Sequence, residues 1–286
     1  MDVAGRRAPT IRLRRLGAEL KRLRVEAGLS QEDAAERTGL DPSSFSRIEQ
    51  ARNRPQRRTV MTLLDLYRVD PDRREILLSW LKESTKPGWT QFYEPFLTEP
   101  YMTFIQFEYE AERLRNYESL FIPGLLQTKE YARAVIEGVV PAISAEDVQR
   151  RVDVRMQRQS VLGRPTPMQL WAVVDEAAIR RKVGGPAVMR AQLEHLVTAS
   201  ASPHVNLQVV PFEVGAHPGM PGSFVVMDFA EQVDVPIVYS DSMAGDIFLE
   251  AEEEVARFAA TFQRISEQAL SQAQTRKLIK EAAAAA

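Results

Sequence analysis

The stretch LSQEDAAERTGLDPSSFSRIEQARNRP, residues 29–55, decides the fold of the N-terminal part of the chain. Ser30 and Asp33 have the spacing of an acidic capping box, which predicts that a helix begins at Gln31. Gly39 is placed to end this short helix, because glycine adopts the left-handed backbone that closes a helix at no steric cost. Leucines at helical spacing precede the stretch, and an apolar helix over 59–67 follows it, so both sides supply core.

A second short helix is predicted directly after this turn, with Asp41 as its N-cap and Pro42 at its first position. Two short helices joined by a tight, glycine-containing turn predict a helix-turn-helix motif. At 100° per residue, Phe45 and Ile48 fall on the buried side, and Glu49 lies at its edge with a structural role. The opposite side presents hydroxyl, guanidinium and amide groups suited to the major groove: Ser43, Ser46, Arg47 and Gln50. Arginines that follow are expected to meet phosphate: Arg52, Arg54, Arg57 and Arg58. The alternative is an ordinary helical bundle with a solvated basic face.

Charge is distributed unevenly along the 286 residues. From Met1 to Arg68 there are fifteen Lys+Arg and nine Asp+Glu, or +6, and the remainder has twenty-two against thirty, or −8. A basic head on an acidic body is the pattern of nucleic-acid binding confined to the head. An arm of basic residues at the N-terminus is either a set of phosphate contacts or a disordered tail: Arg6, Arg7, Arg12, Arg14 and Arg15.

Composition narrows the class of protein further. The chain has no cysteine, which excludes disulfides and thiolate zinc sites and fits a cytoplasmic protein. No apolar run approaches the ~20 residues that span a bilayer. The N-terminal arginines are not followed by an apolar core, so a signal peptide is not expected.

A domain boundary is expected at Pro87-Gly88, which gives a helix-turn-helix domain with a connecting helix at 1–85 and a C-terminal domain at 86–286. In the second domain, helices are expected at 104–115, 125–138 and 144–162. The first of these would carry a polar stripe of Glu108, Glu112 and Arg115. The arginines of the third are either a second nucleic-acid surface or a solvated face that pairs with acidic helices.

Beyond Met168 the pattern changes to strands, at MQLWAVVDE, VNLQVVPFE, SFVVMDF and PIVYSD. Helices are expected at VMRAQLEHLVTAS, EEEVARFAATFQRISEQALS and TRKLIKE, with the terminal alanines frayed. The predicted fold class is therefore α+β and mostly helical: an all-α helix-turn-helix domain, then an α+β domain with a small sheet.

No catalytic, metal or cofactor motif is evident in the second domain. The histidines at 195, 204 and 217 do not have the spacing of a helical metal pair. Asp175 and Glu176, at a strand end, are either an acid/base pair or a helix cap, and the cap is preferred. The glycine- and proline-rich loop over 215–224 is either a long hairpin connection, the preferred interpretation, or a lid over a ligand. The chain is thus expected not to be an enzyme and to need no cofactor.

Residues 16–69 resemble the XRE-type, lambda-repressor-like helix-turn-helix family, through the skeleton "R…GLSQ…A…G…S..S..E.G.R.P". Ala51 stands where many members have glycine. The resemblance implies that Gln31 and Ser44 contact the DNA backbone and that Ser43, Ser46 and Arg47 contact bases. The predicted DNA-binding residues are then Gln31, Ser43, Ser44, Ser46, Arg47, Gln50, Arg52 and Arg54.

The segments YESLFIPGLLQTKEYARAVIEG, RMQRQSVLGRP, LWAVVDEAAIRRKVGGPAVMRAQLEHLV and VNLQVVPFEVGAHPGMPGSF resemble the large C-terminal domain of actinobacterial XRE-type regulators. Those regulators are often encoded beside a small acidic protein, in a toxin–antitoxin-like (Scr-type) arrangement. The resemblance implies ligand sensing or partner binding by the C-terminal domain, without a site that maps onto residues.

The expected function is that of a cytoplasmic, nucleoid-associated, sequence-specific transcriptional regulator, which binds double-stranded DNA as a homodimer because two half-sites match a two-fold axis. One alternative is an antitoxin-like interaction protein that binds a small acidic partner, with DNA binding secondary. Another is an enzyme tethered to DNA, which needs a pocket of convergent polar groups around Asp175 or His217.

Overall fold

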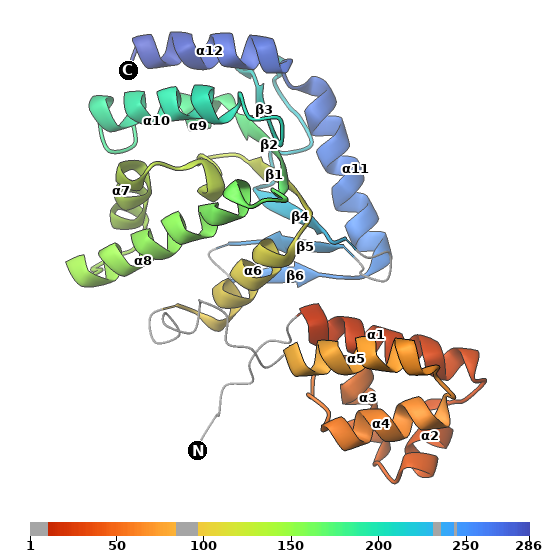
Figure 1. Ribbon diagram of the computed structural model, residues 1–286. Helices are drawn as coiled ribbons and strands as arrows, with labels where there is room; N and C mark the ends of the chain where they lie inside the picture. Colours follow the sequence, from red (N-terminus) through yellow and green to blue (C-terminus); the bar gives the residue numbers. More distant parts are fainter. Residues whose placement is uncertain (1–10, 84–96, 231–235, 243–244) are drawn as a thin grey trace. The chain divides into compact units, whose positions relative to one another are not determined.

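The computed structural model describes residues 11–83, 97–230, 236–242 and 245–286, and the chain divides into two compact units (Figure 1). The first unit holds α1 to α5 and most of α6, and the second holds the rest. The predicted domain boundary at 85/86, with Pro87-Gly88, lies outside the described residues and stays a prediction. Arg6 and Arg7 of the basic arm lie outside them too, whereas Arg12, Arg14 and Arg15 belong to the first turns of α1.

Five helices belong wholly to the first unit: α1 (Ile11–Glu26), α2 (Gln31–Thr38), α3 (Pro42–Glu49), α4 (Arg57–Leu66) and α5 (Pro71–Glu83). The predicted caps are confirmed. Ser30 and Asp33 bond each other's backbone N–H at 3.0 and 3.1 Å, and Gly39 closes α2 with φ 67°. The Asp41 carboxylate accepts the Ser44 N–H at 2.8 Å, with Pro42 behind it. Each such cap is worth about 1 kcal/mol, so the sequence itself fixes where α2 and α3 begin.

The core of this unit is contributed by all five helices, and its fully buried members include Leu16, Leu20, Phe45, Val60, Leu63, Leu64 and Leu77. Ala51, at the position where the resembling family favours glycine, adopts φ 54°. The preference for glycine follows, because this left-handed backbone strains a residue that has a Cβ.

Gly17 lets α1 approach the end of α3 closely. A Cβ at this position would lie 2.6 Å from the Glu49 carbonyl oxygen and 2.9 Å from that of Ile48. Both atoms belong to backbone, which cannot swing away as a long side chain would.

We therefore expect Gly17→Ala to destabilise the first unit by about 1–3 kcal/mol, since α1 and α3 must separate. The same substitution at Gly138, a helical glycine with nothing within 4 Å of its added Cβ, should stabilise the chain by up to about 1 kcal/mol. Urea denaturation measures both. A Gly17→Ala midpoint equal to wild type would show that the two helices are not held at this distance.

The second unit is built on one mixed sheet in the order β3-β2-β1-β4-β5-β6. Its strands are β1 (Arg113–Glu118), β2 (Gln169–Asp175), β3 (Val205–Val210), β4 (Phe224–Asp228), β5 (Ile237–Ser240) and β6 (Ile247–Leu249). The three strands β1, β2 and β3 run parallel, and β4, β5 and β6 continue the sheet in antiparallel register. The four predicted strands correspond to β2, β3, β4 and β5, and the α+β fold class is confirmed.

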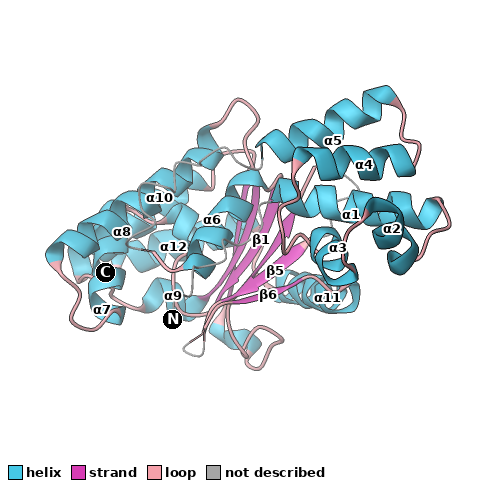
Figure 2. Cartoon of the chain, turned by 90° about the horizontal axis from the view of Figure 1, so that it is seen from below, coloured by secondary structure: helices cyan, strands magenta, loops and turns pink. Residues whose placement is uncertain are grey.

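Helices cover both faces of the sheet (Figures 1 and 2). One face carries α7 (Lys129–Val139), α8 (Ala145–Arg158) and α10 (Pro186–Ala199), and the other carries α11 (Glu252–Gln268). The second unit also holds α9 (Glu176–Arg180), α12 (Gln272–Ala284) and the last turn of α6 (Glu99–Glu110), whose other residues belong to the first unit. Phe262 and Ile265 of α11 pack against apolar residues of the strands to form one core. The strand residues in this core include Tyr117, Val173, Phe224, Val226 and Val238.

Strand β1, at the centre of the sheet, corrects the predicted helix over 104–115. Helix α6 ends at Glu110, and RLRNYE then forms β1, paired with both β2 and β4. The predicted stripe of Glu108, Glu112 and Arg115 is accordingly wrong. Arg115 extends from the sheet and holds Asp228 of β4 at 2.8 Å. Three of the six residues of β1 are charged, which is unusual for a central strand. The strand accommodates them because Arg115 is paired with Asp228, and Arg113 and Glu118 lie at the two ends.

Two further expectations are corrected. The loop over 215–224 is not a hairpin connection, because β3 and β4 lie on opposite sides of the β2–β1 pair. The terminal alanines are not frayed, since α12 continues to Ala284 with Ala282 and Ala283 buried. Within the described ranges, no helix is both long enough and apolar enough to cross a membrane.

Candidate nucleic-acid interface

The two faces of α3 are divided as the sequence predicts. Phe45, Ile48 and Glu49 are buried against the first unit. The opposite face carries polar side chains that remain partly or fully accessible: Ser43, Ser44, Ser46, Arg47 and, as the C-cap, Gln50. These donors and acceptors are of the kind that bond base edges and phosphates.

The accessible side chains of α3 are linked to one another at its surface. Arg47 Nη2 donates to the hydroxyls of Ser43 and Ser44, both at 3.1 Å, and Gln50 Nε2 donates to Ser46 Oγ at 3.1 Å. Hydrogen bonds from Ser44 and Ser43 also hold the pKa of the Asp41 carboxyl well below its ordinary value. These surface bonds contribute little individually, so DNA can replace them without a large energetic cost.

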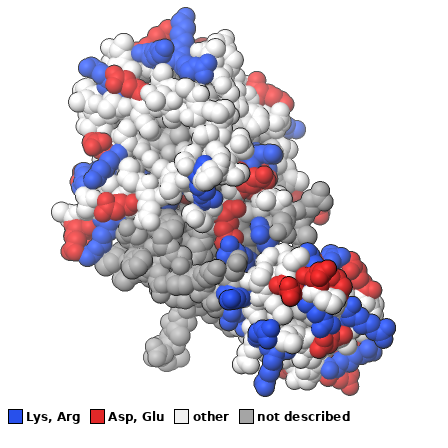
Figure 3. Space-filling view, in the orientation of Figure 1, with Lys and Arg blue, Asp and Glu red and all other residues white. Residues whose placement is uncertain are grey.

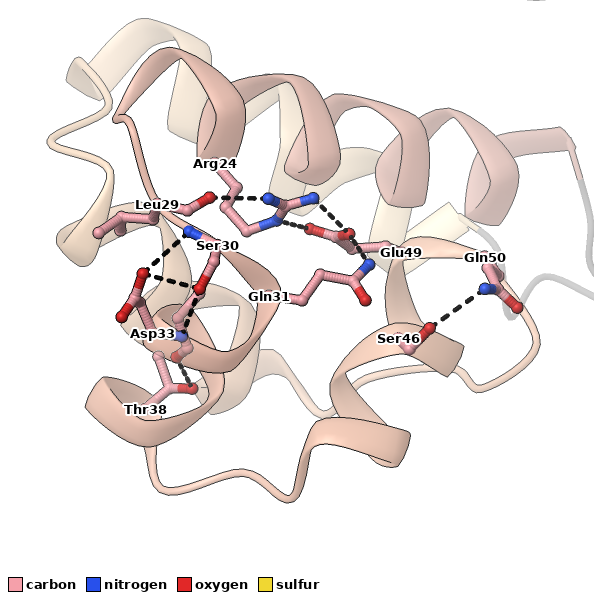
Figure 4. A network of polar contacts seen from close by, with 10 residues as sticks. Arg24, Leu29, Ser30, Gln31, Asp33, Thr38, Ser46, Glu49 and Gln50 are labelled. Carbon is pink, nitrogen blue, oxygen red and sulfur yellow. Dashed lines mark hydrogen bonds and ion pairs between the residues drawn. The ribbon is translucent and has the colours of Figure 1, made fainter.

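A buried ion pair fixes the base of α3 (Figure 4). The Glu49 carboxylate accepts from Arg24 Nε at 2.7 Å and Nη2 at 3.1 Å, and from Gln31 Nε2 at 2.7 Å. Arg24 Nη1 donates in addition to the Leu29 carbonyl at 2.7 Å. The hydrogen bonds that Arg24 donates to Glu49 raise the pKa of Arg24, so this guanidinium stays charged. One carboxylate thus connects α1, α2 and α3, which confirms the structural role predicted for Glu49.

Gln31 is therefore turned toward Glu49, half-buried at the first position of α2. Its contact with the DNA backbone stays a prediction. Arg24 was not among the predicted site residues, because its partner lies 25 positions along the chain and no local pattern connects them. The family skeleton, which begins with an arginine at this position, held the only signal.

The arginines that follow α3 differ in their surroundings. Arg52, Arg57 and Arg58 are exposed. Helix α4 begins at Arg57 without a side-chain cap and without an acidic residue in its first turn, which leaves N–H groups and positive charge suited to a phosphate. Arg54 is exposed as well, but its Nη2 donates to the Leu81 carbonyl at the end of α5 at 2.9 Å. Among these, Arg57 and Arg58 have the more suitable surroundings for a phosphate.

Charge on the first unit is mixed on the side that Figure 3 draws, where Lys and Arg side chains alternate with Asp and Glu. Some of the acidic side chains are paired with arginines nearby. The buried Glu19 carboxylate, for example, accepts hydrogen bonds from Arg22 at 2.7 Å and from Arg73 at 3.0 Å. The hydrogen bond from Arg22 lowers the pKa of Glu19 most, against burial. The net positive charge of this unit is therefore carried by its more exposed arginines.

The second candidate site, around Asp175 and His217, holds a loop in place. Gly219 N–H donates to His217 Nδ1 at 3.2 Å, which leaves the ring proton on Nε2, directed at Asp175 Oδ2 at 3.2 Å. Asp175 also caps α9 through the Ala177 N–H at 2.8 Å, as predicted. Burial raises the pKa of Tyr117, which packs edge-on against the His217 ring. In the described part of the chain, no group of three or more His, Asp or Glu side chains could hold a metal.

Comparison with protein families gives two matches. Residues 15–77 match the model described as a helix-turn-helix domain, which covers most of α1, all of α2, α3 and α4, and half of α5. Residues 101–281 match the model described as a domain of unknown function (DUF5753). No curated protein and no solved structure matches the chain. Because the second model spans more than half of the 286 residues, the chain belongs to the DUF5753 family and carries a helix-turn-helix domain in front of the family's domain.

Proposed function

We propose that this chain is an XRE-type, sequence-specific transcriptional regulator that binds double-stranded DNA as a homodimer in the cytoplasm. Its C-terminal domain would sense a ligand or bind a small partner protein, and it would neither catalyse a reaction nor need a cofactor. The observation that supports DNA binding is the accessible polar face of α3, fixed to α1 and α2 by the Arg24–Glu49–Gln31 network. A dimer follows because one small domain covers too few base pairs for specific binding, whereas two half-sites double the contacts.

The test is binding of the full-length protein to its own upstream DNA and to a scrambled duplex, at two salt concentrations. We expect a complex with the upstream DNA that is tighter by about a thousandfold or more and that weakens as salt rises. Equal affinity for both duplexes at both salt concentrations would contradict sequence-specific binding.

For base recognition, we expect Arg47→Ala to weaken operator binding by about 1–3 kcal/mol and to relax preference at one base position. Arg47 lies on the accessible face of α3, where its Nη2 donates to the hydroxyls of Ser43 and Ser44 on the same helix, so its loss should leave the fold intact. Competition against single-base operator variants measures this. Unchanged discrimination at every base would mean that another helix contacts the bases.

For phosphate contact, we expect Arg57→Ala to weaken all sequences about equally and to reduce the salt slope by about one ion. Arg54→Ala provides the comparison. If Arg54 acts mainly through the Leu81 carbonyl, its loss should lower the stability of the first unit more than it changes the salt slope. An Arg57→Ala effect restricted to one base pair would contradict the phosphate role.

The antitoxin-like alternative draws support from apolar side chains exposed on the second unit. Leu120, Phe212 and Met220 are 48%, 57% and 65% exposed. Leu120 follows the carboxyl end of β1, Phe212 follows that of β3, and Met220 lies in the loop that leads to β4. In the segment over 104–138, most large apolar side chains are buried, and Tyr109 and Leu120 are the exposed ones, so this segment does not carry a broad apolar patch. A small acidic partner protein would therefore be sought at this strand edge, by co-purification with the wild type and with Met220→Asp.

A role without catalysis is supported by how the polar groups around His217 are used. Asp175 bonds His217 and so ties the loop over 215–224 to the end of β2. The Phe212 N–H donates to Glu176 Oε2 at 2.9 Å and ties the turn after β3 to the start of α9. Groups engaged in fastening a loop are poorly placed to exchange protons with a substrate.

A further inference from the structure

The loop over 215–224 crosses the sheet at the carboxyl ends of its central parallel strands. It follows the short turn after β3 and leads to β4, which lies on the far side of β2 and β1. In open α/β sheets, ligands bind outside the carboxyl ends of the parallel strands, next to the place where the strand order reverses. The loop therefore covers the part of the sheet at which a ligand of this domain is expected.

His217 fastens the loop with a side chain that is itself enclosed. Its imidazole is 5% exposed, and its Nε2 donates to Oδ2 of Asp175, at the end of β2, at 3.2 Å. The other ring nitrogen, Nδ1, accepts the Gly219 N–H at 3.2 Å. The ring also packs edge-on against Tyr117 of β1, with 6.0 Å between the ring centroids. An imidazole thus fills a place that is bounded by a carboxylate and an aromatic ring.

Tyr117 carries a polar group that the loop leaves unsatisfied. The residue is 0% exposed, and its hydroxyl has no hydrogen-bond partner within the described ranges. Gly219 lies directly on it, because a Cβ at this glycine would be 2.4 Å from Cζ and 2.8 Å from the hydroxyl oxygen of Tyr117. A buried hydroxyl without a partner is unfavourable. The loop therefore covers a group that a ligand with a polar atom would satisfy.

Glycines at both ends of the loop are suited to act as hinges. Gly215 has φ 68° and Gly222 has φ 148°, and a Cβ at either position would meet nothing within 4 Å. Hinges are a few residues at loop ends that absorb large changes in φ and ψ. Between these two glycines, among the described residues, the bond from His217 to Asp175 is the one that ties the loop to a strand. Release of this one bond frees the loop to swing.

We propose that His217 occupies a ligand site between Asp175 and Tyr117 as a built-in competitor. The ligand belongs to the class of small planar heterocycles that carry an N–H group, such as an imidazole or a fused imidazole ring. Its N–H donates to Asp175 in place of His217, and a second ring nitrogen accepts from the Tyr117 hydroxyl. The loop over 215–224 is then a hinged strap, which swings aside when the ligand takes the place of the imidazole. The proposal rests on the ligand-sensing role proposed above, and it names the site and the class of ligand.

The strap connects this site to the surface of the second unit. Met220 follows Gly219 in the strap, its N–H donates to the His217 carbonyl at 3.2 Å, and its side chain is 65% exposed. A ligand that displaces His217 therefore moves an exposed apolar side chain, at the edge where a partner protein would be sought. Binding of a small molecule is thereby converted into a change of the protein surface.

The seating of the strap is tested with Gly219→Ala, which leaves His217, Asp175 and Tyr117 in place. The backbone of Gly219 is not left-handed, so alanine fits its conformation. The added methyl group overlaps the Tyr117 ring, which the core holds, so the loop must lift. Hydrogen exchange of the full-length protein should then show the amides over 215–222 exchanging at least about tenfold faster than in the wild type.

Gly163→Ala is the matched control for this measurement. Gly163 is exposed, and a Cβ there would meet nothing within 4 Å, so exchange over 215–222 should equal that of the wild type. Equal exchange in Gly219→Ala and the wild type would overturn the strap, because it would show that the loop is not seated on Tyr117.

The ligand site is tested with imidazole as the probe, on full-length protein without DNA at about pH 8, where imidazole is neutral. A tethered side chain competes at a high effective concentration, so the wild type should bind imidazole weakly. His217→Ala removes the competitor and should bind imidazole at least about tenfold more tightly, as measured by the rise of the unfolding midpoint with imidazole concentration. N-methylimidazole has the same ring without an N–H, and it should bind to His217→Ala at least about tenfold more weakly than imidazole.

Two further variants localise the binding. Asp175→Asn, combined with His217→Ala, keeps the Oδ1 atom that caps α9 and replaces the Oδ2 acceptor by an N–H donor, so imidazole affinity should fall about tenfold or more. Gly219→Ala keeps every ligand-binding group and should bind imidazole more tightly than the wild type, which makes the test independent of the stability of His217→Ala.

Three outcomes would overturn the ligand site. They are that imidazole stabilises neither His217→Ala nor Gly219→Ala, that N-methylimidazole binds as well as imidazole, and that Asp175→Asn leaves the affinity unchanged. Because no DNA is present, none of these results depends on whether an operator is bound, and failure here is distinguishable from failure of the DNA-binding proposal.

Discussion

Arg24→Met is expected to destabilise the helix-turn-helix unit by about 3–5 kcal/mol, because it leaves the Glu49 carboxylate buried without its charged partner. The side chains of Arg24 and Glu49 are 9% and 2% exposed, so water cannot take the place of the guanidinium. Gln31 would remain as a neutral donor to Glu49, which offsets a part of the loss. Since whole domains are stable by about 5–15 kcal/mol, a loss of this size removes much of the folded state.

Urea denaturation of the full-length chain measures the effect in the transition of the first unit. Lys21→Met, an exposed position on the same helix, should change stability by no more than about 0.5 kcal/mol. The double variant Arg24→Met/Glu49→Leu should recover most of the loss, because replacing both partners by apolar groups removes the uncompensated charge. If the double variant is as unstable as Arg24→Met, the loss comes from packing and the ion pair is not its cause.

The same network accounts for what the sequence could and could not predict in the first unit. The caps formed by Ser30 with Asp33 and by Asp41 with Ser44 join residues three positions apart, so the sequence pattern alone predicts them. The burial of Glu49 follows from helical spacing. Its partner does not, because a bond between Arg24 and Glu49 depends on how α1 packs on α3, which local sequence does not specify.

The second unit shows the same division on a larger scale. Strands β2 to β5 are rich in apolar residues or alternate clearly, and they were predicted. The predicted helix over 104–115 runs into the first three residues of β1, because the charged residues of this strand have partners far along the chain, as Arg115 has in Asp228. Without β1 the order of the strands cannot be derived from the sequence, and a hairpin is then the simplest expectation for the loop over 215–224.

Glu108→Ala is expected to destabilise the second unit by about 3–5 kcal/mol, for the same reason as in the first. Arg158 and Glu108 are 5% and 2% exposed, and their two 2.7 Å bonds join α8 to the last turn of α6. The variant leaves a guanidinium enclosed by protein, which cannot lose its charge at any pH at which the chain is folded. Urea denaturation should show the loss in the transition of the second unit.

Glu146→Ala gives the matched comparison, because Glu146 pairs with Arg150 on the same α8 but is 73% exposed. Its loss should cost no more than about 1 kcal/mol, since water replaces the carboxylate at the surface. Glu108→Leu combined with Arg158→Met should again recover most of the stability. Similar losses for Glu108→Ala and Glu146→Ala would show that the Arg158 site admits water. In that case the ion pair could not hold the end of α6 rigidly against α8.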